Sequence, residues 1–419
     1  MKTIVRVIFM VLAAVLLIAP ACEREKSHTG PAEKEVPGVT NSEILIGSSL
    51  ALSGHAGYLG TQTLRGAMSY INHVNERGGV HGRKIKIISY DDQYDPPLCV
   101  GNTHKLIVDH GVFALFCYVG TPTIVKIIPL VNKANIPLLG MFTGANALRE
   151  PMSRYIINVR ASYYQETEEA VRRFVKNLGL SRIAVFYQYD AYGFDGLKGT
   201  ELALKKFGLV PVATGTYIRG TLDVKEGLKK IAASEAEAVV MIGTYEPCAE
   251  FINLALEKGF SPVFYNVSFV GAEELARRLG GRGENVFVTQ VVPPPQSPES
   301  RTLLWGSGEY IDLLEKYFPD EKPNAVGLEG YINARVLVEG LRRAGLNLNR
   351  ERFIDAVESI RNFSLGIANT LSFGPRDHQG FERVYFTQFK DGRFRLVTDW
   401  GMVKEDLRTQ TRQDLDASE

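Results

Sequence analysis

Short apolar runs alternate with longer segments of helical spacing along most of this chain, beginning at residue 43. The first run, ILIGSSLAL at 44–52, has the length and composition of a buried strand, and in the segment after it Leu64, Ala67 and Ile71 recur on one helical face. Strands joined by helical crossovers pair in parallel, and the right-handed crossover packs helices onto the sheet. The alternation therefore predicts an α/β chain with doubly wound parallel sheets.

The alternation falls into two series, which predicts two similar Rossmann-like lobes. The expected strands of the first series cover 44–52, 84–90, 112–119 and 136–141, and those of the second cover 182–188, 210–217, 238–243, 262–267 and 285–292. Pro293-Pro294-Pro295 ends the last strand and marks a crossing between lobes. After three expected helices (299–318, 326–344 and 351–361), the alternating pattern at 370–397 predicts antiparallel hairpins.

These patterns divide the chain into an N-terminal segment, two discontinuous lobes and a tail. Lobe 1 is expected to comprise 43–159 plus 290–370, lobe 2 to comprise 160–289 plus 371–403, and the tail to cover 404–419. The three crossings between the lobes are expected near 158–161, 287–291 and 369–373. A hinge motion at these segments would open and close the space between the lobes.

Residues 1–21 have the composition of an export signal. Lys2 and Arg6 precede an uncharged apolar run at 7–18, and small residues follow it. The run is shorter than the about 20 apolar residues that cross a bilayer, so a permanent membrane span is the weaker interpretation. The sequence therefore predicts a chain that works outside the cytoplasm.

Cys22 raises the question of a membrane anchor. The stretch before it resembles a bacterial lipoprotein lipobox, in which the cysteine becomes the lipidated first residue, although Ala19 and Pro20 depart from the usual pattern. Lipidation of Cys22 and cleavage to a free periplasmic protein both remain open. Residues 22–42 are rich in charge and poor in apolar side chains, which predicts a flexible linker.

Charge and motif content argue against several function classes. Lys plus Arg is 48 and Asp plus Glu is 47; removal of Lys2 and Arg6 with the signal gives 46 − 47 = −1, which lacks the basic excess of a nucleic-acid-binding protein. The chain contains no GxSxG, GxxxxGK[ST], CxxC or HExxH motif, and its histidines are scattered. We therefore expect no enzyme, no metal and no cofactor, and we expect a monomer.

The three cysteines after Cys22 allow at most one disulfide bond within the chain. In an oxidising compartment a disulfide between Cys99 and Cys117 is plausible, which would leave Cys248 over. The alternative is that Cys117 is a core thiol at the end of a strand.

Three stretches carry a recognisable pattern: IGSSLALSGHAGYLG, INHVNERGGVHGRKIKIISYDDQYDP and GTPTIVKIIPLVNKANIPLLG. Together with DAYGFDGLKG and GTYEPCAEFINLALEKGF, they resemble the type I periplasmic solute-binding proteins of branched-chain amino acid and amide ABC transporters. The resemblance covers 43–400. It implies two α/β lobes joined by three crossings, a small-molecule ligand in the cleft between them, and an ABC permease as partner.

Open α/β sheets bind ligands beyond the carboxyl ends of their strands, and the loops expected there are rich in Gly, Thr, Ser and Tyr. The resemblance and these loops together give the candidate ligand-binding residues Ser53, Tyr58, Thr121, Thr123, Thr143, Gly144, Ala145, Tyr163, Tyr192, Tyr245 and Ser268. Thr121 stands where the family has a ligand-binding serine, and Tyr245 matches the family's cleft tyrosine.

Each candidate has a structural alternative. Thr121 and Thr123 suit a plain N-cap as well as a ligand oxygen, and the loop at 143–145 suits a simple turn. The tyrosines provide apolar walls for a cleft but also pack well at a lobe surface. Asp91, Asp92 and Asp95 suggest a cation site, yet their position before Pro96-Pro97 favours helix capping.

One departure affects the expected ligand. Amino-acid-binding members of the family place an acidic residue after the fourth strand of the second lobe, where this chain has YNVSFVG and offers Ser268. A buried ammonium without a counter-charge costs several kcal/mol. Either another group neutralises the ammonium, for which the face of Tyr245 is a candidate, or the ligand carries no ammonium. The expected ligand is therefore a small amino acid, an amide or a carboxylate. A ligand-sensing adaptor for a signalling receptor is the alternative to transport.

Overall fold

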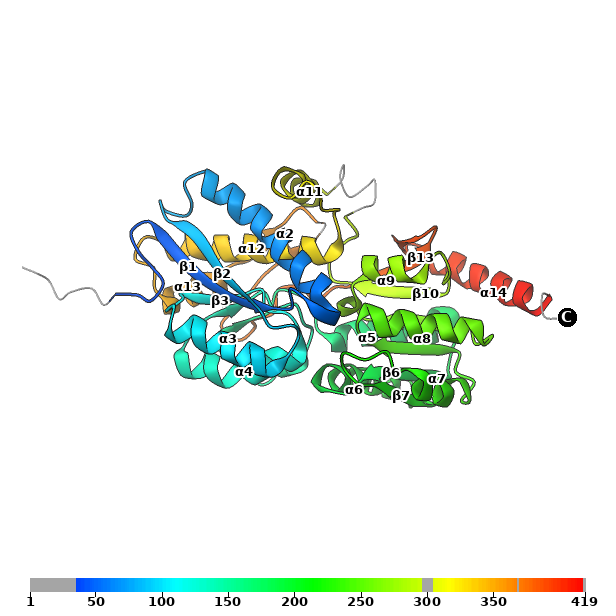
Figure 1. Ribbon diagram of the computed structural model, residues 1–419. Helices are drawn as coiled ribbons and strands as arrows, with labels where there is room; N and C mark the ends of the chain where they lie inside the picture. Colours follow the sequence, from blue (N-terminus) through cyan, green and yellow to red (C-terminus); the bar gives the residue numbers. More distant parts are fainter. Residues whose placement is uncertain (1–34, 296–303, 368, 417–419) are drawn as a thin grey trace, which may run out of the picture. The chain divides into compact units, whose positions relative to one another are not determined.

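The computed structural model describes residues 35–295, 304–367 and 369–416. Val36–Glu419 forms one compact unit, and every contact given below lies within its described residues. Most of its strands belong to two sheets, each with helices packed on it (Figure 1). The expected export signal, Cys22 and most of the linker lie outside the described residues.

The first sheet is entirely parallel, as the sequence predicts. Ile44, Ile46 and Leu50, in the strand at 43–50, are buried because helices cover both faces of a parallel sheet. In spatial order its strands are β2 (Lys84–Asp91), β1 (Glu43–Leu50), β3 (Ala114–Phe116), β4 (Leu138–Leu139) and β5 (Ile156–Ile157). We call this sheet and its helices the first lobe.

Two sets of helices cover the two faces of the first sheet (Figure 1). One set is α3 (Pro96–Val108) and α4 (Thr121–Ala134), and the other is α2 (Gly57–Glu76), α11 (Trp305–Tyr317), α12 (Ala325–Ala344) and α13 (Arg350–Glu358). Helices α2 and α12 lie unusually close. A Cβ atom on Gly66 would overlap the carbonyl oxygen of Gly327, and one on Gly330 would overlap that of Thr63.

We expect Gly66→Ala to destabilise the protein by about 1–3 kcal/mol, because the added methyl group forces two packed backbones apart. Gly101→Ala is the matched control. Gly101 also lies inside a helix, but nothing lies within 4 Å of the position of its Cβ atom, so the change stabilises by about 0.5–1 kcal/mol. Urea unfolding of both variants measures the difference. Equal stability of the two variants would contradict the close packing of α2 on α12.

The second sheet has five parallel strands and an antiparallel hairpin at one edge. In spatial order its strands are β14 (Arg393–Leu396), β13 (Tyr385–Lys390), β10 (Val286–Gln290), β9 (Val263–Asn266), β8 (Ala238–Ile242), β6 (Ile183–Gln188) and β7 (Thr214–Tyr217). The hairpin β13–β14 confirms the antiparallel pairing expected near the C-terminus. This sheet and its helices are the second lobe.

The helices of the second lobe occupy the expected intervals between its strands. They are α5 (Tyr163–Arg173) with the π-helical turn η3 (Phe174–Leu178), α6 (Ala191–Lys205), α7 (Lys225–Ala232), α8 (Tyr245–Glu257) and α9 (Ala272–Leu279). Short 3₁₀ turns are η1 (Gly54–Ala56), η2 (Asn146–Leu148) and η4 (Ser268–Val270). No helix was expected at the C-terminal end, but α14 (Trp400–Asp416) runs from the last residues assigned to lobe 2 into the expected tail. Its Trp400 ring lies 6.1 Å from that of Phe287.

The chain passes between the two sheets after β5, after β10 and before β13. Two of these crossings are bonded to each other: the N–H of Asn158 donates to the carbonyl of His378, and the N–H of Gly380 donates to the carbonyl of Asn158. The sequence placed the third crossing at 369–373, which is too early. β12 (Thr370–Leu371) pairs with β11 (Phe363–Ser364), and Leu371 is buried among first-lobe side chains.

The proposed bond between Cys99 and Cys117 is absent, and both residues are buried free thiols. Cys99 lies in α3, whereas Cys117 belongs to the buried cluster on the α12 side, where the Asn333 amide lies 3.6 Å from its sulfur. The two thiols therefore belong to different packing layers of the first lobe. The alternative interpretation, a core thiol at the end of a strand, describes Cys117.

Within the described part of the chain, every helix is too short or too polar to span a bilayer.

Candidate functional site

Loops from both sheets meet where the strands end, and polar first-lobe side chains gather there. Thr121 begins α4, and its hydroxyl shares a hydrogen bond of 2.6 Å with that of Thr143, which follows β4. The backbone N–H of Ala145 also donates to the Thr143 hydroxyl. The carbonyl of Gly144 accepts from the N–H of Tyr163 at the start of α5. These contacts join the first lobe to the first residues beyond the crossing.

Arg160 lies at the centre of this region on the crossing segment between β5 and α5. Its side chain is 2% exposed, and its guanidinium lies 4.5 Å from the centre of the Phe142 ring. One N–H donates to the hydroxyl of Ser268. Nε and Nη1 are buried without a hydrogen-bond partner. A guanidinium has five N–H donors in a planar fork, so Arg160 has unused capacity to bind an oxygen acceptor.

Two buried carboxylates flank Arg160, one from each lobe. Glu166 of α5 lies 3.7 Å from Nη2, and Glu329 of α12 lies 3.5 Å from Nε. Glu166 is fully engaged: it accepts from the N–H and hydroxyl of Ser268 and from the hydroxyl of Thr289. Among the residues that the structure describes, no such set of donors surrounds Glu329. Burial raises the pKa of Glu329 to about 7, against the opposing effect of the Arg160 charge.

Aromatic rings fill the space beside Arg160. The ring of Phe269, from the second lobe, lies 5.6 Å from Phe142 and 5.9 Å from Tyr94, both of the first lobe. It also lies 4.8 Å from Tyr192, which in turn lies 5.2 Å from Tyr163. All five rings are buried, and they join the cores of the two lobes into one continuous cluster. We call Arg160, its two carboxylates, the Thr121–Thr143 pair, Ser268 and these rings the Arg160 cluster.

Further contacts between the lobes lie around the cluster. The N–H of Asn146 donates to Asp195 of α6 over 2.9 Å, and burial raises the pKa of Asp195 to about 6. On another side, the N–H of Ala325 donates to Glu273 of α9 over 2.8 Å. Since each bond joins residues of different lobes, separation of the lobes must break it.

The structure brings most of the predicted ligand-binding residues together at the Arg160 cluster. Two others contact each other outside the cluster. Thr121, Thr143, Gly144, Ala145, Tyr163, Tyr192 and Ser268 all lie in or against the Arg160 cluster. Tyr58 and Tyr245 form an edge-to-face pair across the two lobes, with ring centres 6.1 Å apart. The guanidinium of Arg278 lies 5.3 Å from the centre of the Tyr245 ring.

Two predicted residues have local roles instead. The hydroxyl of Thr123 donates to the carbonyls of Val119 and Gly120, so it serves the first turn of its own helix. Ser53 is exposed, and its hydroxyl donates to Asp91 over 2.5 Å. Neither lies in the Arg160 cluster. The prediction that Asp95 caps a helix is confirmed, because its side chain accepts from the N–H of Leu98 at the start of α3.

Sequence reasoning missed the charged members of the cluster. Arg160 lies in the short segment NVRAS, which matches no motif. The sequence does contain a signal for Glu329. It is the single charged residue in the apolar helix segment AVGLEGYINA, and a carboxylate buried there needs a partner. The carboxylates of the cluster therefore come from Glu166 and Glu329, which are far from Ser268 in the sequence.

Comparisons with known proteins agree with this architecture. A family model described as a periplasmic binding protein matches residues 43–393. The Leu/Ile/Val-binding protein homolog 7 of Brucella abortus (strain 2308) is 24% identical over 315 residues, which span 72% of this chain and 78% of that protein.

Solved structures extend the similarity to nearly whole chains. A possible leucine/isoleucine/valine-binding protein from Rhodopirellula baltica SH 1 has a TM-score of 0.80 and 34% identity, and the match covers 87% of this chain and 98% of that one. The fatty acid ABC transporter substrate-binding protein from Thermomonospora curvata has a TM-score of 0.78 and 21% identity, covering 87% and 93%. This last similarity concerns the fold alone.

Proposed function

Because the chain belongs to the periplasmic binding protein family, we propose that it is the extracytoplasmic solute-binding component of an ABC uptake system. Its ligand is a small solute with a carboxylate, bound between the lobes at the Arg160 cluster, and an α-amino acid is the leading candidate. The names of the similar proteins from Brucella abortus and Rhodopirellula baltica, which refer to leucine, isoleucine and valine, support this choice.

The N–H groups of Arg160 that make no hydrogen bond are the observation on which the proposal depends. A buried donor without a partner costs about 1–3 kcal/mol, and a charged one costs more. A ligand carboxylate removes this cost by accepting from Nη1, and charge-assisted bonds of this kind are strong. Glu329 offers a carboxylate on the other side of the guanidinium, where it would accept from the ammonium of an amino acid.

Binding requires the lobes to separate, because the rings of Phe142 and Phe269 close the route to Arg160. Both rings are fully buried, and they come from different lobes. Hinge motion at the crossings exposes Arg160, and a ligand that contacts both lobes then favours closure by its differential affinity for the closed state.

A thermal-shift screen of the chain without its signal tests the proposal. The probes are the α-amino acids, their amides, short carboxylates and aromatic acids. At 100 times its dissociation constant a ligand adds about 2.7 kcal/mol to the stability, which is readily detected. We expect shifts from carboxylates and none from amides that lack a carboxylate. Recovery of the ligand unaltered supports binding, whereas shifts from amides alone would contradict the role of Arg160.

We propose in addition that Cys22 is lipidated and holds the protein at the outer face of the cytoplasmic membrane, near its permease. In a host that processes lipoproteins, the unaltered chain is expected in the membrane fraction and Cys22→Ser in the soluble periplasmic fraction. A membrane-bound Cys22→Ser variant would contradict the anchor.

A further inference from the structure

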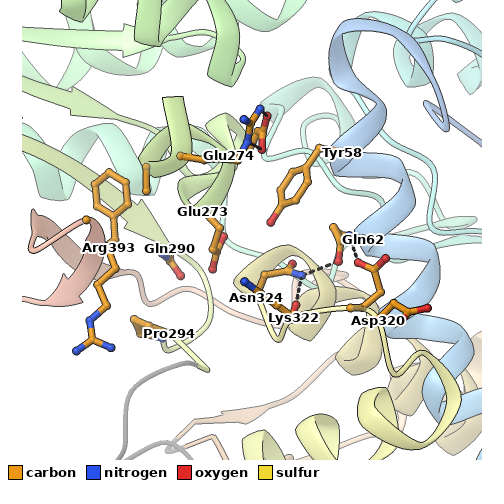
Figure 2. Close-up of a pocket in the computed structure, with 15 residues that line it drawn as sticks. Tyr58, Gln62, Glu273, Glu274, Gln290, Pro294, Asp320, Lys322, Asn324 and Arg393 are labelled. Carbon is orange, nitrogen blue, oxygen red and sulfur yellow. Dashed lines mark hydrogen bonds and ion pairs between the residues drawn. The ribbon is translucent and has the colours of Figure 1, made fainter. Parts of the chain in front are cut away.

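A second cavity lies on another side of the interface between the lobes, with a volume of about 540 Å³. Its walls come from α2 and the loop before α12 in the first lobe, and from α9, the end of β10 and the β13–β14 turn in the second (Figure 2). We call it the α9 pocket. It shares no residue with the Arg160 cluster.

The α9 pocket contains two buried oxygen acceptors without a donor. Gln290 is 3% exposed, and its Oε1 has no hydrogen-bond partner. Glu273 accepts from the N–H of Ala325 through Oε1, but Oε2 is buried and has no partner. In Figure 2 both side chains point into the pocket. A buried carboxylate oxygen without a donor is costly, so this pair requires an explanation.

Several other polar groups of the pocket already have partners. Gln62 and Asn324 are bonded to each other over 2.6 Å, with the Asn324 amide as donor. The carboxylate of Glu274 is paired with Arg277 at 2.7 Å, and Glu321 is paired with Arg65. The contrast singles out Glu273 and Gln290 as the acceptors that a ligand would use.

No cation of the pocket neutralises Glu273. Lys322 and Arg393 are exposed, and Figure 2 shows the guanidinium of Arg393 directed away from Glu273. Burial raises the pKa of Glu273, against the opposing effect of the backbone N–H of Ala325, which donates to its carboxylate. A positively charged ligand would restore the ionised carboxylate and supply the missing donors together.

We propose that the α9 pocket binds the ammonium group of a primary organic amine. The three N–H donors of such a group suit Glu273 Oε2 and Gln290 Oε1, and its alkyl chain would lie against the ring of Tyr58. A metal ion suits the pocket poorly, because Ca²⁺ and Mg²⁺ take six or more oxygen ligands. Among the described residues, no group of three His, Cys, Asp or Glu side chains is arranged to hold a metal.

An amine in this pocket would influence closure of the lobes. Its walls belong to both lobes, and the bond from Ala325 to Glu273 already joins them. The charge of Glu273 also acts on Glu329, the carboxylate next to Arg160. Binding at the two sites is therefore coupled, and by linkage each ligand changes the affinity for the other by the same factor.

Isothermal titration of the chain without its signal tests the α9 pocket, with pentylamine as the probe and no amino acid present. 1-Pentanol is the neutral control, since it has the same alkyl chain without the charge. We expect pentylamine to bind and 1-pentanol not to bind. We expect Glu273→Gln to lose about 10-fold in amine affinity, because the amide keeps the acceptor for Ala325 but removes the charge.

Glu246→Gln is the matched control, because it removes a carboxylate of the same lobe that is paired with Arg278 and does not line the pocket. We expect it to retain amine affinity within about twofold. Equal losses in the two variants, or no amine binding up to about 10 mM, would overturn the proposal. The outcome is separable from the proposed function: amine binding that depends on Glu273 supports the α9 pocket even if no amino acid binds, and amino-acid binding without amine binding refutes the pocket alone.

Discussion

Arg160→Leu is expected to cost about 3–5 kcal/mol of folding stability at pH 8, because it leaves two buried carboxylates without their shared cation. The substitution also removes the guanidinium from the Phe142 ring. Under the proposed function it abolishes ligand binding as well. Urea unfolding of the variant and the parent chain measures the change in the free energy of unfolding.

Two further variants separate the charge effect from general disruption. Arg395→Leu removes an exposed arginine from an exposed pair with Asp391, so it should cost about 0–1 kcal/mol. Combining Arg160→Leu with Glu329→Gln should recover part of the loss, since only one uncompensated carboxylate remains. A loss below about 1 kcal/mol in Arg160→Leu would contradict a structural role for this charge.

Glu329 is expected to make the protein less stable as the pH rises from about 5 to 8. Its pKa is about 7 in the folded protein, above the ordinary 4.5, so folding favours the protonated carboxyl. This stability is fully present below pH 4.5 and is lost as the pH rises through 7. The difference corresponds to roughly 3 kcal/mol at most.

Glu329→Gln should remove this part of the pH dependence, because an amide does not titrate. Urea unfolding between pH 5 and 8 compares the variant with the parent chain. The comparison is needed because burial also raises the pKa of Asp92 and of Asp195 to about 6, so both titrate in the same range. Glu339→Gln, on the same helix but paired with Arg343, should leave the slope unchanged. The same pH dependence of the unfolding free energy in the parent chain and in Glu329→Gln would contradict the assignment of this titration to Glu329.

The sequence predicted the regular part of the fold because that part depends on local patterns. Apolar runs such as 44–52 and 238–243 became β1 and β8, since a strand covered on both faces must be apolar throughout. The third crossing was misplaced because β11 and β12 are short and pair through non-local contacts that no periodicity records. The prediction of a disulfide was wrong because the spacing of two cysteines in the sequence does not reveal which packing layer each one occupies.

The sequence predicted the loop residues of the candidate site but not its charged residues. Thr121 and Thr143 follow strands, so the doubly wound topology brings them to one edge. Arg160, Glu166 and Glu329 come from a crossing and two helices, and only the tertiary structure brings them together. Phe269 shows the same limit, since nothing in YNVSFVG indicates that its ring packs against the opposite lobe.

The bonded crossings restrict how the two lobes can move. Since Asn158 exchanges backbone hydrogen bonds with His378 and Gly380, these two segments behave as one narrow ribbon. A ribbon of paired chains bends more readily across its flat face than within its plane. Under the proposed function, rotation about a single axis is therefore favoured over twisting or sliding, and the same opposing surfaces meet each time the lobes close.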